Sequence, residues 1–160
     1  MLSYFAFAFV AGLMLIAAYY DGRFMIIPNW ISIALIIGFA GFAAVYGFTF
    51  EDWLWHLGVC VAVFAIGLIF FFLNAMGGGD VKLLAATSIW FGVTGLLPFI
   101  FYVSTLGALL AIGKMIWIAI AARRVGTKLS RKLLMKSEIP YGIAIALGAI
   151  LAFPLSLWMA

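Results

Sequence analysis

Long apolar runs separated by short polar segments dominate the chain and predict helices that cross a membrane. Such a helix needs about 20 apolar residues, and runs of this length recur along the sequence. The apolar stretch from Val81 to Ala122 is too long for one helix, and Gly92–Pro98 is its natural break. We therefore expect about six transmembrane helices, at Leu2–Tyr20, Asn29–Phe48, Trp53–Leu73, Val81–Leu97, Pro98–Ala122 and Ile139–Trp158.

Short polar segments mark the expected ends of these spans. The first span ends on two tyrosines, which favour the membrane–water interface, and Asp21 follows them. Because the residue before a proline is pushed out of the helical region, we expect Gly22–Ile27 to be a connection that leads to Pro28. We expect Glu51 and Asp52 to form an acidic turn before the third span.

The composition places the chain among polytopic membrane proteins. Hydrophobic residues make up 69% of it and charged residues only 9%, a balance that a soluble core does not explain. The expected fold class is all-α, with residues 1–160 forming a single integral-membrane domain and no soluble domain. The first run lacks the positive region and cleavage site of a signal peptide, so we expect it to be retained as a helix.

The basic residues cluster beside apolar runs, where they set the orientation in the membrane. Six of the nine Lys and Arg residues lie in Arg123–Lys136, and the positive-inside rule places this loop in the cytoplasm. Counting back through alternating spans, Asp21 and Asp80 fall on that side, while Glu51 and Asp52 fall outside. The net charge of +4 therefore does not indicate nucleic-acid binding. We expect the basic loop to orient the chain and contact lipid rather than bind substrate.

The stretch Asn74–Lys82 places three glycines and a carboxylate directly after a long apolar run. A lone acid between apolar runs is costly near lipid, so Asp80 is a candidate functional residue with a partner elsewhere. Gly77–Gly79 allow turns that are closed to other residues and let another group approach the backbone. The alternative is structural, with a flexible turn and Asp80 as the N-cap of the next helix.

Asp21 and Asp80 are expected at the same membrane face, where two carboxyl groups can meet. Such a pair cannot ionise independently, so at intermediate pH the two groups share one proton. One group can then deprotonate a water while the other protonates a carbonyl oxygen, which is the chemistry of aspartic proteases. The alternative is that Asp21 caps a helix and forms an exposed pair with Arg23.

Three segments of the chain resemble, in order, the signatures of the prepilin peptidases, which are intramembrane aspartic peptidases with a Gly-x-Gly-Asp motif. The segments are Tyr20-Asp21 followed by Ile27-Pro28-Asn29, then Gly77-Gly78-Gly79-Asp80-Val81-Lys82, and finally Ile139-Pro140-Tyr141-Gly142. The resemblance covers essentially the whole chain. It implies that Asp21 and Asp80 are the catalytic pair.

The same resemblance implies a substrate and its binding residues. The glycines would shape the approach to Asp80, and Asn74 is equally well explained as a helix-capping residue. The implied substrate-binding residues are Gly77, Gly78, Gly79, Asn74 and Lys82. The substrate would be the leader of a type IV pilin-like (prepilin) precursor, cut on the cytoplasmic side, commonly after a glycine, without a metal or cofactor. The implied location is the bacterial inner membrane, with pilus or type II/IV secretion machinery as indirect partners.

The chain is more compact than the longer bacterial members of this group. It has neither their cytoplasmic insert nor their paired cysteines, which are associated with N-methylation of the new pilin terminus, so methyltransferase activity is not expected. It resembles the small peptidases of tight-adherence (Flp) pilus systems and the archaeal preflagellin peptidases. Presenilin-type proteases share the Tyr-Asp and Gly-x-Gly-Asp elements, but the short length and the Ile-Pro-Asn match favour the prepilin group.

Other functions have weaker support in the sequence. His56 and Cys60 would share a helix face, but two ligands do not close a zinc site, and an interfacial histidine beside an apolar thiol explains them. A small proton-coupled transporter would place its acids near mid-membrane, whereas both aspartates are expected at an edge. A noncatalytic secretion-system subunit would tolerate asparagine at Asp21 and Asp80.

Overall fold

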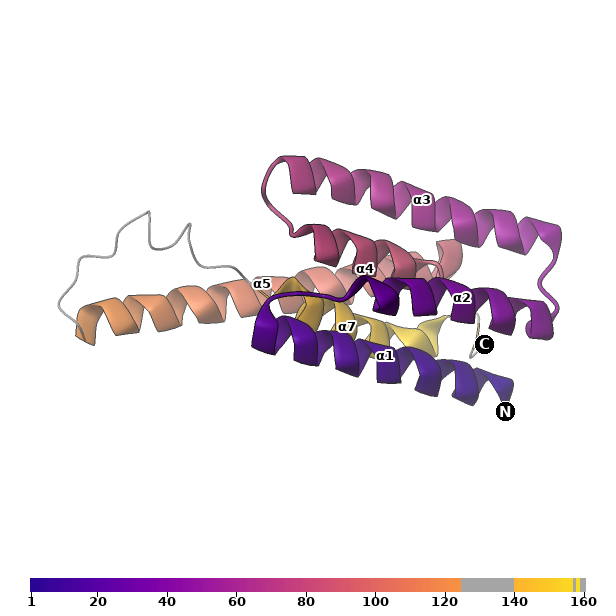
Figure 1. Ribbon diagram of the computed structural model, residues 1–160, viewed down its shortest axis with the longest axis horizontal. Coiled ribbons are helices and arrows are strands. Elements are labelled where there is room, and N and C mark those ends of the chain that lie inside the picture. The colour runs from indigo at the N-terminus through magenta and orange to yellow at the C-terminus, as the bar shows by residue number, and fades with distance from the viewer. Residues whose placement is uncertain (125–139, 157, 159–160) are drawn as a thin grey trace.

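The computed structural model describes residues 1–124, 140–156 and 158, which form an all-α bundle without strands (Figure 1). The predicted fold class is confirmed. Most of the basic loop Arg123–Lys136, together with Ile139, lies outside the described residues. The helices are α1 (Leu2–Phe24), α2 (Asn29–Tyr46), α3 (Phe50–Phe72), α4 (Gly78–Ser88), α5 (Gly92–Arg124) and α7 (Tyr141–Ala152), followed by the 3-10 helix η1 (Phe153–Leu155).

Four of these helices, α1, α2, α3 and α5, are long and apolar enough to cross a membrane by length and composition. α4 has 11 residues and α7 has 12, which corresponds to about 16–18 Å each. They take the places of the predicted spans Val81–Leu97 and Ile139–Trp158 and are shorter than both. The chain therefore combines long membrane helices with two short ones inside the bundle.

The division of the long apolar stretch differs from the sequence prediction. α4 ends at Ser88, and the chain turns at residues 89–91, so the predicted break within Gly92–Pro98 is wrong. Gly92 permits this turn because it adopts a φ of +57, in the left-handed region that favours glycine. α5 then continues through Pro98, which leaves only the carbonyl of Thr94 without its helical hydrogen bond.

The ends of the first and third helices also differ from the prediction. α1 continues to Phe24, so Asp21 lies in its last turn and the connection to α2 is shorter than expected. The acidic turn predicted before the third span is instead part of α3. Thr49 and Asp52 form a reciprocal capping box there, with the Asp52 carboxylate accepting from the Thr49 backbone N–H at 2.8 Å.

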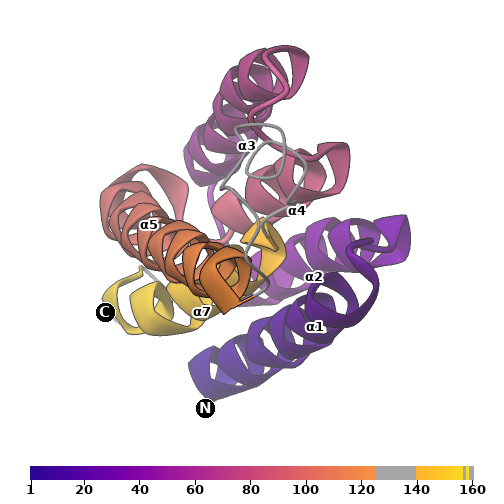
Figure 2. The same cartoon turned by 90° about the vertical axis from the view of Figure 1, so that its left-hand side faces the viewer.

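α4 lies at the centre of the bundle, between α2 and α3 (Figure 2). From Leu83 to Ser88 every residue is buried, as expected for a helix enclosed on all sides. The hydroxyls of Thr87 and Ser88 donate to carbonyls one turn earlier, Leu83 at 2.7 Å and Ala85 at 2.8 Å. α4 therefore needs no outside partner for these buried polar groups, and it holds Asp80 at its N-terminal end.

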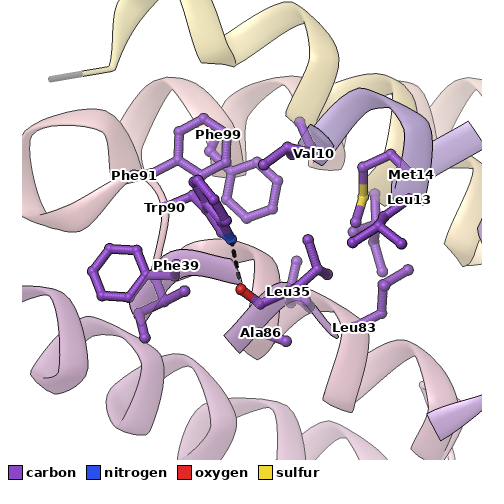
Figure 3. Close-up of a cluster of buried hydrophobic side chains, with 14 of the residues drawn as sticks. Val10, Leu13, Met14, Leu35, Phe39, Leu83, Ala86, Trp90, Phe91 and Phe99 are labelled. Atoms are coloured by element: carbon purple, nitrogen blue, oxygen red, sulfur yellow. Dashed lines mark hydrogen bonds between the residues drawn. The ribbon is translucent and has the colours of Figure 1, made fainter. Parts of the chain in front are cut away.

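Trp90, in the turn after α4, is the centre of an aromatic core (Figure 3). It is fully buried, and its indole N–H donates to the carbonyl of Leu35 at 3.1 Å. The indole of Trp158 donates in turn to the carbonyl of Trp90 at 2.7 Å. Buried indoles need such partners, so the turn between α4 and α5 is fixed to α2 and to the C-terminal segment. The cluster also includes Phe39, Phe91 and Phe99.

His56 supports the same turn from α3. It is buried rather than interfacial, at 5% exposed, and its Nδ1 lies 2.6 Å from the carbonyl of Ile89. The ring stacks on Phe39 and fills the space next to Gly92. His56 therefore has a structural role at the end of the bundle opposite to the start of α4.

We expect Gly92→Ala to lower the free energy of unfolding by roughly 2–5 kcal/mol. A left-handed alanine costs about 1–2 kcal/mol. The added Cβ would also lie 2.7 Å from Nε2 of His56 and displace the ring. Loss of the buried hydrogen bond between Nδ1 of His56 and the carbonyl of Ile89 costs about 1–3 kcal/mol. The melting temperature of the detergent-solubilised variant measures the effect. Gly12→Ala is the control, because no neighbouring atom lies within 4 Å of its Cβ; equal melting temperatures for the two variants would contradict this role of Gly92.

Candidate active site

One end of the bundle collects the residues singled out from the sequence. α1 and α3 end there, α2, α4 and α7 begin there, and α5 extends beyond the other helices (Figure 1). A cavity of about 770 Å³ opens between them. It is lined by Asp21, Met25, Ile26, Ile27, Asn29, Phe71, Asn74, Ala75, Met76, Gly77, Gly78, Gly79, Asp80 and Tyr141.

Asp21 enters this cavity from the last turn of α1. Its side chain is 5% exposed, and its Oδ2 has no hydrogen-bond partner among the described residues. Arg23, in contrast, is exposed. The alternative of an exposed pair between Asp21 and Arg23 is therefore wrong.

Asp80 enters the cavity from the first turn of α4. The N-cap of that helix is Gly77, so the alternative of Asp80 as N-cap is wrong, although an acid in a first turn does favour the helix. Asp80 is 9% exposed, and its Oδ1 has no hydrogen-bond partner among the described residues.

The protonation of Asp80 follows from its surroundings. It lies outside the four long apolar helices. Burial raises the pKa of its carboxyl to about 7, the charge of Asp21 acts in the same direction, and the backbone amides of Gly77 and Gly142 oppose the shift. Asp80 therefore keeps its proton to higher pH than an ordinary carboxyl group, which fits a pair of carboxyl groups that share one proton.

The three glycines before Asp80 face three different neighbours. A Cβ at Gly77 would lie 2.9 Å from Oδ2 of Asp80, one at Gly78 would lie 3.3 Å from the Phe71 ring, and one at Gly79 would lie 3.3 Å from Cβ of Ile27. None of the three glycines has a positive φ. They are needed here for close approach rather than for an unusual backbone conformation.

Asn74 and Lys82 are placed differently from each other. Asn74 lines the cavity and has a φ of +55 directly after the end of α3, a conformation that asparagine tolerates better than most residues. Its position supports the interpretation of Asn74 as a residue that ends a helix, and the residue also borders the cavity. Lys82 does not line the cavity; its Nζ donates to Oδ1 of Asn29 at 3.1 Å.

Several cavity residues were not assigned to the site from the sequence. Asn29 and Tyr141 belong to quoted signature segments, which is a signal that could have found them. Met25, Ile26, Phe71 and Met76 have no such signal, because an apolar residue in an apolar chain does not stand out. Gly142 is also in a signature segment, and a Cβ there would lie 2.8 Å from Oδ2 of Asp21.

The described residues hold no group of three His, Cys, Asp or Glu side chains that could bind a metal ion. His56 lies in the aromatic core, and Cys60 is half-buried on the same helix. The prediction that the protein uses no metal or cofactor remains a prediction.

A model of the type IV leader peptidase family matches residues 8–112, which include both aspartates and the glycines before Asp80. No curated protein and no solved structure matches the chain. The family match covers more than half of the chain and agrees with its helical membrane fold. This chain therefore belongs to the type IV leader peptidase family.

Proposed function

We propose that this peptidase removes the leader of a type IV pilin-like precursor by activating a water between Asp21 and Asp80. The observation that carries the proposal is the pair of buried carboxyl groups on one cavity, each with an oxygen that has no partner among the described residues. A water between them would satisfy both oxygens. Family membership supports a peptidase over a transporter.

The proposed reaction needs one ionised and one protonated carboxyl group. The ionised group takes a proton from the water as the water oxygen attacks the scissile carbonyl carbon, and the protonated group donates its proton to the carbonyl oxygen. Collapse of the resulting gem-diol breaks the C–N bond and transfers one proton to the leaving amine. One water is consumed, and the pair again holds a single proton.

We propose that the precursor enters along the glycine segment. Gly77, Gly78 and Gly79 leave the backbone open to close approach, and Asn74 borders the same cavity. Apolar side chains of the α1–α2 connection and of Phe71 and Met76 would contact apolar residues of the precursor. Lys82 would act through Asn29 rather than by contact with the precursor.

The direct test is processing of a pilin-like precursor. The chain is co-expressed with a candidate precursor, and leader removal is followed by the shift in mass of the product. Removal that depends on both Asp21 and Asp80 is expected. Intact precursor beside folded, membrane-inserted protein would contradict the proposal for that precursor, and cleavage that requires added zinc would contradict the aspartate mechanism.

The orientation of the site also belongs to this proposal. We expect the loops at Asp21, Asp80 and Arg123–Lys136 to face the cytoplasm, because Lys and Arg are concentrated in that loop. Cysteines introduced at Glu51 and Lys128 should then be labelled by membrane-impermeant reagents from opposite sides. Labelling of both from the same side would overturn this orientation and the assignment to the inner face of the bacterial membrane.

A further inference from the structure

Gly142, the second residue of α7, packs directly on Asp21. It is buried, and an added Cβ would lie 2.8 Å from Oδ2 and 2.9 Å from both Cβ and Cγ of Asp21. The Cβ contact involves the rigid start of the side chain, so rotation of the carboxylate alone cannot make room. Only glycine therefore lets the first turn of α7 approach Asp21 this closely.

The first turn of α7 has no side-chain cap of its own. Its N-cap is Pro140, which makes no side-chain hydrogen bond, and the N–H of Ile143 donates to the Pro140 carbonyl at 3.3 Å. The N–H groups of Tyr141 and Gly142 have no partner within the helix. The positive end of the helix dipole stabilises a carboxylate at such a position. Asp21 is the carboxylate on which Gly142 packs, and the backbone amide of Gly142 also acts on Asp80.

Asp80 is in a different setting, although it too lies in the first turn of a helix. Gly77 approaches only its Oδ2, at 2.9 Å, while Cγ lies 3.8 Å away. Burial outweighs the favourable effect of the helix end and raises the pKa of Asp80 to about 7. The two carboxyl groups are therefore held by different surroundings, which is how acid and base roles are divided in such pairs.

We propose that Gly142 is a positioning residue, which places the first turn of α7 against Asp21 so that Asp21 is the ionised base and Asp80 the acid. The inference rests on the proposed function. Among the described residues, the other titratable groups on the helices around Asp21 include Tyr20 and Arg23 on α1, Lys82 at the start of α4 and Tyr141 on α7. Lys82 and Arg23 are exposed, Lys82 is bonded to Asn29, and Tyr141 lines the cavity.

The first test compares Gly142→Ala with Gly22→Ala. Gly142→Ala should lower kcat by about 100-fold, the effect of a misplaced catalytic group, with KM nearly unchanged. It should also move the acidic limb of the pH profile of kcat to higher pH, because Asp21 becomes harder to ionise. Gly22→Ala adds the same methyl group between α1 and α7 but meets only the flexible end of Ile143 at 3.3 Å, so it should leave kcat and both limbs unchanged.

The reciprocal variant is Gly77→Ala, whose Cβ meets Asp80 alone. It should move the basic limb of the profile and leave the acidic limb in place. A uniform loss of kcat in Gly142→Ala without movement of the acidic limb would indicate a merely structural role. Movement of the basic limb by Gly142→Ala would reverse the assignment of acid and base.

If Gly142→Ala fails to fold, the order in which the two aspartates titrate can still be measured in protein that keeps its native glycines. The chain has only three aspartates, so carbon-13 labelling of their carboxyl carbons gives three signals that Asp21→Asn and Asp80→Asn assign. Asp21 should lose its proton at lower pH than Asp80, and the opposite order overturns the inference. Failure of the proposed function is recognised separately, because Asp21→Asn would then cleave the precursor normally whatever the order of titration.

Discussion

Asp21→Asn and Asp80→Asn are each expected to abolish leader cleavage while leaving the protein folded and inserted. Asparagine keeps the size and hydrogen-bonding capacity of aspartate but can neither accept a proton from water nor donate one as an acid. General acid–base catalysis contributes about 10²–10⁴-fold to rate, so processing should fall by at least that factor. The measurement is the fraction of precursor processed in membranes at matched expression.

The third aspartate of the chain provides the control for this experiment. Asp52 lies in the capping box of α3, at the opposite end of the bundle from the cavity, so Asp52→Asn should process the precursor at the normal rate. If Asp21 and Asp80 act as one unit, the double variant should be about as inactive as either single variant. Near-normal processing by Asp21→Asn or Asp80→Asn would remove that residue from the catalytic pair.

Cleavage is also expected to slow as the pH rises above about 7. Burial and the charge of Asp21 raise the pKa of Asp80 to about 7, and above it the site loses the proton that the carbonyl oxygen requires. The rate should then fall about tenfold for each pH unit, as one limb of a bell-shaped profile. Processing by purified enzyme across the pH range measures this, and a rate that continues to rise to high pH would contradict the acid role of Asp80.

The stability of the protein should depend on pH through the same residue. Because the folded pKa of Asp80 lies above the ordinary value of 3.8, between about pH 4 and 7 the folded state binds a proton that the unfolded chain has released. Its contribution to the free energy of unfolding therefore decreases as pH rises through this window. Asp80→Asn removes this contribution, so the variant should melt at a higher temperature than the wild type at pH 8 and at nearly the same temperature at pH 4.

The order of the helices could be predicted from the sequence, and so could the position of both aspartates at the same end of the bundle. Apolar length identifies the four long helices, although it also predicted full spans where the short helices α4 and α7 lie. Alternation of spans brings the ends that carry Asp21 and Asp80 to one side, where the structure places both on one cavity. The glycines before Asp80 were also predicted at this site, and they line it. These features depend on chain length and on rare polar residues, which stand out in an apolar sequence.

The turn between α4 and α5 could not be predicted, because an apolar chain carries little information on which helix faces are buried. α4 is enclosed by other helices and α5 is largely exposed, yet both belong to one long, mainly apolar stretch of the sequence. The sequence predicts a break within Gly92–Pro98, but the hydrogen bonds of Trp90 and His56 and the contact of His56 with Gly92 fix the turn at residues 89–91. The apolar residues that line the cavity, such as Phe71 and Met76, could not be predicted for the same reason.

The length of α5 has a consequence for the lipid around the enzyme. Its apolar part, Gly92–Ala121, has 30 residues, or about 45 Å, against a hydrocarbon thickness of about 30 Å. Tilting alone would require roughly 48°, beyond the range of about 0–40° seen for membrane helices. A helix of this length adapts to the bilayer by combining tilt with kinking, for which Pro98 offers a place, or with local thickening of the bilayer. Because Val103 of α5 contacts Gly148 of α7, a change in tilt acts on the helix that carries Gly142, and cleavage rates in vesicles of short and long acyl chains should differ.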